Sequence, residues 1–156
     1  MVDRNAIGRT SKPAINEVEK GAIRRLAEAL GETNPIYFEE GAARAAGYRG
    51  VVAPPTFPTT LRAGSDLRES LLVSPQKHLL QAEQSIEYAR PIVAGDRLTV
   101  TSRVAEISQR STPSGLTDVV VIEDEGRDEG GALVYRSRSL WVVRTAPKHA
   151  QGEMHE

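Results

Sequence analysis

The hydrophobic pattern of the chain changes its period near Leu80, and this change constrains the fold more than any other feature. Before this point apolar residues recur at helical spacing, and after it they alternate with polar residues, as in strands. Segments rich in Gly, Pro, Ser and Asp separate the predicted strands. Four consecutive strands with short connections predict an antiparallel meander. Their ranges are Gln81–Tyr88, Arg97–Gln109, Thr117–Asp124 and Ala132–Arg144.

Two helices are predicted in the first third of the chain. The first covers Glu17–Leu30, with Asn16 as its N-cap, Glu19 three residues later as the partner in a capping box, and Gly31 as its stop. A short Ala-rich helix follows at Glu39–Ala46.

A third helix, Pro55–Leu71, is expected to be the central one. It follows the extended arm Val51–Pro54, and Pro58 is compatible only with a first helical turn. Its apolar residues are expected to form one buried stripe, although Gly64 interrupts it. The stripe consists of Phe57, Leu61, Leu67 and Leu71.

Length and composition narrow the class of protein. The 156 residues fit one domain, which we place at 1–145, and the polar residues 146–156 are expected to form a disordered tail. A net charge of −1 without a dense basic patch argues against nucleic-acid binding. No apolar run is long enough to span a membrane, and no signal peptide is evident. The absence of cysteine agrees with a cytoplasmic location.

No metal site is expected from the sequence. The three histidines lack the spacing of metal ligands, and two of them lie in the tail. The acidic run Glu123–Glu129 is interpreted as a solvated hairpin tip rather than a cation site. We therefore predict that neither a metal nor another cofactor is needed.

Two separated motifs point to a known family. Residues Gly31–Glu39 read Gly-Glu-Thr-Asn-Pro-Ile-Tyr-Phe-Glu, which resembles the signature Gly-Asp-x-Asn-Pro-x-His-x-Asp of the MaoC-like (R)-specific hydratases and dehydratases. The resemblance continues through Ala45–Tyr48 and Val51–Pro54, and returns in Arg90–Leu98. It spans roughly residues 17–144.

The resemblance implies a hot-dog fold of the α+β class, in which a curved antiparallel sheet wraps around a central helix. It also implies pairing of subunits, with acyl-thioester tunnels at their junction. In active members an aspartate–histidine dyad adds water to, or removes it from, a 2,3-enoyl thioester. A backbone N–H at the start of the central helix binds the enolate oxygen. The positions expected to line the substrate here are Asn34, Pro54, Pro55, Thr56 and Phe57.

Three substitutions depart from the active pattern. Glu32 stands at the aspartate position, one methylene longer, and Tyr37 stands at the histidine position. A phenol has a reference pKa of about 10, against about 6.5 for imidazole, so it is a poor base near neutrality. Pro55 aligns with the oxyanion-hole glycine and has no N–H; losing one such donor costs about 10²–10³ in rate. Catalysis by the chain alone is therefore not expected, and the degenerate dyad positions have simpler interpretations. Tyr37 then serves as an aromatic at the core edge and Glu32 as a polar turn residue.

This degenerate pattern is similar to that of the non-catalytic subunit of (3R)-hydroxyacyl-acyl-carrier-protein dehydratase. It is also similar to the dyad-less N-terminal half of two-domain MaoC-like dehydratases. The resemblance implies a subunit that binds an acyl-CoA or acyl-carrier-protein thioester and pairs with a dyad-bearing homologue, or with itself when alone. Two alternatives stay open: a self-sufficient hydratase using Glu32 and Tyr37, and a non-enzymatic acyl-thioester-binding module. Thioesterase chemistry is least favoured, because its candidate carboxylate, Asp66, lies late in the central helix.

Overall fold

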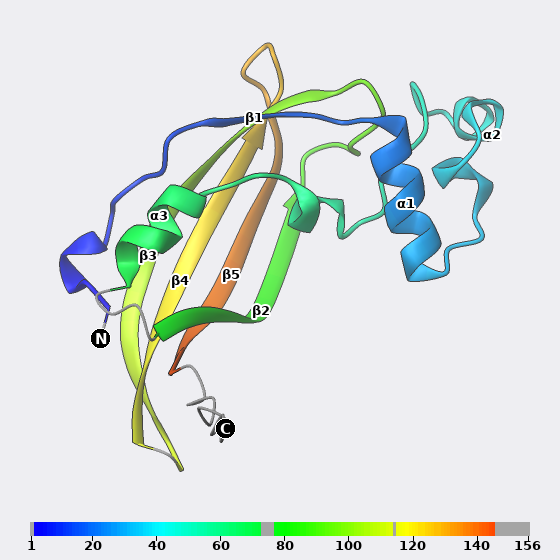
Figure 1. Cartoon of the computed structure of the whole chain (residues 1–156). Coiled ribbons are helices and arrows are strands. Elements are labelled where there is room, and N and C mark those ends of the chain that lie inside the picture. Colours follow the sequence, from blue (N-terminus) through cyan, green and yellow to red (C-terminus); the bar gives the residue numbers. More distant parts are fainter. Residues whose placement is uncertain (1, 73–76, 114, 146–156) are drawn as a thin grey trace, which may run out of the picture.

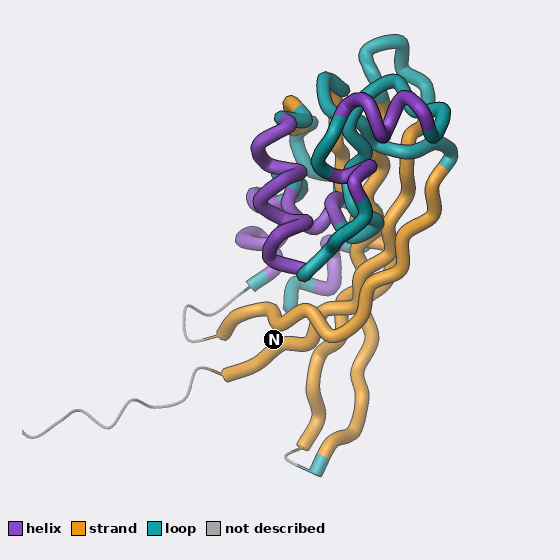
Figure 2. Tube along the Cα trace, turned by 90° about the vertical axis from the view of Figure 1, so that its right-hand side faces the viewer, coloured by secondary structure: helices purple, strands orange, loops and turns teal. Residues whose placement is uncertain are grey.

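The computed structural model describes residues 2–72, 77–113 and 115–145 of the chain. Its centre is one curved sheet whose five strands pair antiparallel in the order β1-β3-β4-β5-β2 (Figure 1). The helices lie on one face of this sheet, and none of the described residues forms a helix over the other (Figure 2). The tail expected at 146–156 lies outside the described residues. The strands are β1 (Ala14–Glu17), β2 (Lys77–Tyr88), β3 (Arg97–Thr112), β4 (Gly115–Arg127) and β5 (Leu133–Thr145).

The strands confirm the change of period but correct the predicted pairing. Strands β3, β4 and β5 form the expected meander, whereas β2 pairs with β5 at the far edge and not with β3. Only Asp128 and Glu129 of the acidic run Glu123–Glu129 lie in the hairpin turn, because residues up to Arg127 belong to β4. There Glu123 and Glu125 form cross-strand ion pairs with arginines of β3 and β5.

The helical segments are shorter than the sequence indicates. They are η1 (Arg4–Ala6), α1 (Lys20–Leu30), η2 (Pro35–Tyr37), α2 (Glu40–Ala45), η3 (Phe57–Thr60) and α3 (Ser65–Leu71). Gly31 ends α1 in the left-handed conformation at φ 71°, as predicted. The capping box is wrong: Glu19 occupies the N-cap without a side-chain hydrogen bond, and Asn16 belongs to strand β1.

The expected central helix is broken into η3 and α3. Leu61 is extended at ψ 147°, and Gly64 is left-handed at φ 56°. A Cβ atom at Gly64 would lie 2.4 Å from the Oγ of Ser102, so only glycine allows the backbone this close to β3. The buried Asn16 bridges the break, because its Oδ1 accepts from the Arg62 N–H at 2.8 Å and its Nδ2 donates to the Arg62 carbonyl at 3.0 Å.

The break divides the expected apolar stripe between two hydrophobic clusters on the helix-covered face. Cluster 1 packs η3, the arm that precedes it and α1 against the sheet, and Phe57 belongs to it. Cluster 2 packs α3 and the N-terminal segment against the sheet, and includes Leu67 and Leu71. Cluster 1 consists of Val18, Ile23, Val51, Ala53, Phe57, Ile92, Leu98, Val100, Val134 and Tyr135. Cluster 2 consists of Val2, Ala6, Leu67, Leu71, Val104, Val120, Ile122 and Val143.

Candidate functional site

The loop after α1 carries the first group of predicted site residues. Asn34 caps η2, since its Oδ1 accepts from the Ile36 N–H at 3.2 Å and Pro35 supplies the first helical position. The side chain of Asn34 therefore shapes the turn that presents Tyr37, while its place among the substrate-lining residues stays a prediction.

Glu32 and Tyr37 interact electrostatically at this loop. Burial raises the pKa of the Tyr37 hydroxyl, and the negative charge of Glu32 and the neighbouring Tyr48 raise it further. The hydroxyl therefore stays protonated at neutral pH, and it can donate a hydrogen bond but not accept a proton. Within the described residues, the Glu32 carboxylate and the Tyr37 hydroxyl make no direct hydrogen bond.

The arm Val51–Pro54 connects this loop to the second motif. The Ala53 N–H donates to the Ile92 carbonyl at 2.8 Å, and the Ala94 N–H donates to the Val51 carbonyl at 2.8 Å. The Val52 N–H donates to the Ile36 carbonyl at 3.1 Å, which joins the arm to η2. The two family motifs, distant in sequence, thus meet on either side of one extended arm.

The arm delivers the remaining predicted residues to the start of η3. Pro54 and Phe57 are buried, whereas Pro55 and Thr56 are exposed. The Pro55 carbonyl accepts a hydrogen bond from the Tyr88 hydroxyl of β2, and the Phe57 N–H is occupied by the Pro54 carbonyl. Proline offers no N–H at position 55. No hydrogen bond among the described residues joins this segment to Tyr37, so the structure brings the two groups to one region without linking them directly.

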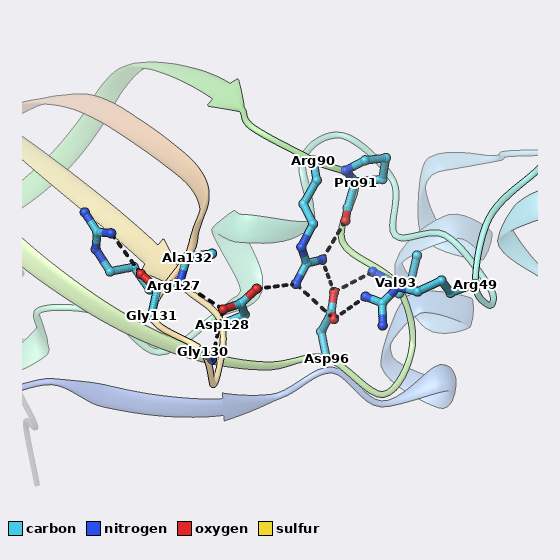
Figure 3. Close-up of polar contacts among 10 residues, drawn as sticks. All are labelled: Arg49, Arg90, Pro91, Val93, Asp96, Arg127, Asp128, Gly130, Gly131 and Ala132. Atoms are coloured by element: carbon cyan, nitrogen blue, oxygen red, sulfur yellow. Dashed lines mark hydrogen bonds and ion pairs between the residues drawn. The ribbon is translucent and has the colours of Figure 1, made fainter.

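A buried carboxylate, missed as a site residue in the sequence, fixes the second motif (Figure 3). The side chain of Asp96 is 5% exposed and accepts hydrogen bonds from Arg90 at 2.8 Å, from Arg49 at 2.9 Å and from the Val93 N–H at 3.0 Å. Burial alone would raise the pKa of Asp96, but the bonds from Arg90, Val93 and Arg49 outweigh it and lower the pKa. We call Arg49, Arg90 and Asp96 the clasp.

The clasp joins three separate segments. Arg49 precedes the arm, and Asp96 closes the turn that leads into β3. Arg90 also reaches Asp128 in the β4–β5 turn at 3.4 Å. The sequence indicated a tight turn at Gly95-Asp96 but did not indicate its arginine partners, of which Arg49 lies 47 residues away along the chain and Arg90 six.

The other candidate groups lie apart from this region. Asp66, the carboxylate considered for thioesterase chemistry, is fully exposed in the first turn of α3, and the Lys12 N–H donates to it at 3.2 Å. The described residues contain no group of three or more His, Cys, Asp or Glu side chains that could hold a metal ion. None of the helices in the described ranges is long and apolar enough to cross a membrane.

Two dehydratases of known structure have the same fold as this chain. A MaoC-like dehydratase of known structure superposes with a TM-score of 0.78 and is 29% identical, covering 90% of this chain and 43% of that chain. The C-terminally truncated HadBC (3R-hydroxyacyl-ACP dehydratase) complex of Mycobacterium tuberculosis gives a TM-score of 0.75 at 24% identity, covering 88% of this chain and 96% of that one. These similarities confirm the hot-dog fold.

Sequence relatives define the family. A UPF0336 protein of Streptomyces griseus is 37% identical over 149 residues, which cover 93% of this chain and 97% of that protein. The family model described as "FAS1-like, dehydratase domain region" matches residues 5–137. With most of its length matched in both comparisons, the chain belongs to the family of FAS1-like dehydratase domain regions.

Proposed function

We propose that this chain is the non-catalytic, acyl-chain-binding subunit of a hetero-oligomeric (3R)-hydroxyacyl-thioester dehydratase or (R)-specific enoyl-thioester hydratase. In this proposal residues 1–145 form one domain that acts in the cytoplasm without a cofactor. The observation that most supports the proposal is that Tyr37 replaces the histidine of the catalytic dyad. A phenol, with a reference pKa of about 10, is protonated at neutral pH and cannot serve there as a base; its raised pKa acts in the same direction.

The start of η3 supports the same conclusion. An enolate oxygen needs a preorganised donor where its charge develops. By the resemblance to active members Pro55 occupies this position, and its carbonyl, an acceptor, already accepts a hydrogen bond from the Tyr88 hydroxyl. A chain with a phenol in place of the dyad histidine, and without this donor, depends on another subunit for its chemistry.

The partner we propose is a homologous subunit that carries the intact dyad. The free edge of β2 offers twelve residues of strand whose outer backbone groups are unpaired in the described chain, a surface suited to pairing of sheets. The HadBC structure is a complex of two subunits, and the MaoC-like dehydratase is more than twice as long as the region it shares with this chain. Both arrangements support a second hot-dog unit beside this one.

Hydration of crotonyl-CoA tests the proposal. The purified chain should show no rate above background, and light scattering should find it as a homodimer or larger. Co-expression with a homologue that carries the Asp-x₄-His dyad should give a heterodimer with activity that depends on the partner's dyad. A purified chain that hydrates crotonyl-CoA by itself, and loses the rate in Glu32→Gln, would contradict the proposal.

That contrary result would favour a second candidate, a self-sufficient hydratase. The electrostatic interaction between Glu32 and Tyr37 favours it, because it brings a carboxylate and a proton donor to one loop. In this mechanism Glu32 is the base and Tyr37 the acid. A heterodimer that binds acyl-CoA without any activity would instead indicate an acyl-thioester-binding module.

A further inference from the structure

The sheet face that the described helices leave uncovered, here called the open face, has an apolar half (Figure 2). Alternate residues of β4 belong to cluster 2 on the covered side, so Val119 and Val121 point the other way. On β5, Leu140 lies directly opposite Val121, and Val142 lies directly opposite Val119. Leu80 of β2 lies opposite Val142 and is 51% exposed. Apolar side chains thus adjoin one another on three neighbouring strands of the open face.

The other half of the open face carries, in two adjacent rows, one sign of charge on each strand. Glu123 and Glu125 project from β4, and on β5 Arg138 lies directly opposite Glu123 and Arg136 directly opposite Glu125. Both arginines form ion pairs with these glutamates at 2.9 Å. The sign of the charge therefore alternates from strand to strand. From β3 to β2 the stripes are Arg103 on β3, Glu123 and Glu125 on β4, Arg136 and Arg138 on β5, and Glu87 on β2.

The open face is hollowed and accessible. A hollow of about 510 Å³ lies over the charged half. A second hollow of about 240 Å³ lies over the apolar half, with Val119, Val121 and Leu140 in its lining. Glu123 and Arg138 stay 37% and 51% exposed in their ion pair. The open face therefore has room for a second layer of protein.

The pattern of the open face is complementary to itself. A two-fold axis parallel to the strands, placed between β4 and β5, lays β4 over β5 of a second copy and β3 over its β2. At the level of one row, Glu123 then meets Arg138 of the second copy, and one row further Val121 meets Leu140 of the second copy. Two sheets packed in this way lie about 10 Å apart and cross at about −30°, which keeps these central rows in contact. An axis perpendicular to the strands would instead place the apolar half against the charged half.

The open face is large enough for a stable contact. Each of its four strands, β2, β3, β4 and β5, is at least 12 residues long. About ten residues on each, with strands roughly 4.8 Å apart and a rise of about 3.4 Å per residue, give a projected area of roughly 650 Å². Stable interfaces bury about 800 Å² of accessible surface on each partner, and side chains make the accessible surface larger than its projection.

We propose that the open face pairs two copies of this chain back to back, about a two-fold axis that runs parallel to β4 and β5. Opposite charges on the central strands set the register of the two copies, and the apolar half supplies the buried core of the contact. This contact is separate from the free edge of β2 and goes beyond the proposed function. If the β2 edge holds a dyad-bearing partner, the open face joins two such heterodimers into an assembly with two copies of each subunit.

Light scattering after size-exclusion chromatography tests the contact on the chain alone at micromolar concentration. Leu140→Arg places a charge against Val121 of the second copy and should halve the mass, whether or not the β2 edge also pairs. Leu116→Arg is the matched control, because Leu116 is 72% exposed and alternates to the other face of β4; it should leave the mass unchanged. An unchanged mass for Leu140→Arg would overturn the proposal. A mass that Leu140→Arg changes only in the complex with the partner subunit would assign the open face to that subunit, and would overturn it as well.

Two charge variants test the register of the copies even if Leu140→Arg does not fold. Glu123→Arg with Glu125→Arg makes both central strands basic, and Arg136→Glu with Arg138→Glu makes both acidic. Exposed ion pairs contribute little to folding, so each variant should fold, but alone each should show half the wild-type mass. An equal mixture of the two should regain the full mass, because every central contact then joins opposite charges. The same mixture with Leu140→Arg added to one variant should not regain it. If the simple mixture stays at half the mass, two copies do not meet through these strands.

Discussion

Removal of the Asp96 carboxylate should destabilise the fold by breaking the clasp. In Asp96→Ala the two hydrogen bonds from Arg90, at 2.8 and 3.2 Å, are lost, together with the bond from the Val93 N–H at 3.0 Å. The Arg49 pair is lost as well, but its guanidinium is on a side chain that is 71% exposed and can return to water.

The loss in the free energy of unfolding depends on how buried each partner of Asp96 is. Bonds to a charged partner contribute about 1.5–3 kcal/mol, and a buried N–H left without an acceptor costs about 1–3 kcal/mol. The exposed Arg49 pair adds about 0–1 kcal/mol. Removing the desolvated carboxylate itself offsets part of this loss. We therefore expect a decrease of about 2–4 kcal/mol in the free energy of unfolding, and a fall in Tm of roughly 5–15 °C for a chain of this size.

Urea denaturation measures the effect directly. The midpoint should fall at an unchanged m-value. Glu129→Ala is the matched control, since its side chain is 72% exposed and 3.7 Å from Arg97, and it should change stability by less than about 0.5 kcal/mol. A loss for Asp96→Ala that equals the control's would refute the reasoning.

Acid titration gives an independent test of the same group. The pKa of Asp96 is lowered from its ordinary value of 3.8, so its contribution is present above pH 3.8 and is lost as the pH falls through the lower native pKa. The unfolding free energy of Asp96→Ala should therefore depend less on pH in this acid range than that of the wild type.

Three further predictions concern the broken helix, the dyad positions and β2. Gly64→Ala should lower the free energy of unfolding by about 1–3 kcal/mol in urea titrations, because the position is left-handed and packed against β3. Glu32→Asp with Tyr37→His should not create hydratase activity, whereas adding Pro55→Gly should raise kcat/KM on crotonyl-CoA; equal values in both variants would mean that residue 55 is not the oxyanion position. Burial raises the pKa of Tyr88 from 10.0 to about 12, so its neutral hydroxyl stabilises the fold below pH 10, and this contribution is lost as the pH rises through 12. Tyr88→Phe should accordingly flatten the alkaline stability curve.

Local signals in the sequence predicted the local structure well. The alternation after Leu80 located four of the strands, and Gly31 marked the end of α1 as expected. The hot-dog fold was predicted correctly from the family resemblance of the motifs Gly31–Glu39 and Arg90–Leu98.

Most of the errors share a long-range cause. Asn16 has the pattern of an N-cap, but the unpaired backbone of Arg62 recruits its amide instead. Gly64 was expected to interrupt the apolar stripe of one continuous helix, whereas its left-handed backbone beside Ser102 separates η3 from α3. Arg49 was missed as a partner of Asp96 for the same reason, since it lies 47 residues away, whereas Arg90 is only six residues away and was missed because hydrophobic periodicity carries no information about polar pairing.

The strand order also determines when the sheet can be completed during synthesis. Strands β3, β4 and β5 follow one another closely along the chain and can pair as soon as each emerges. Strand β1 must wait for β3, and among the described residues β2 cannot find its partner within the sheet until β5 is available. We expect a ribosome-bound chain that ends before residue 133 to leave β2 open to proteolysis, while one extended past 145 protects it.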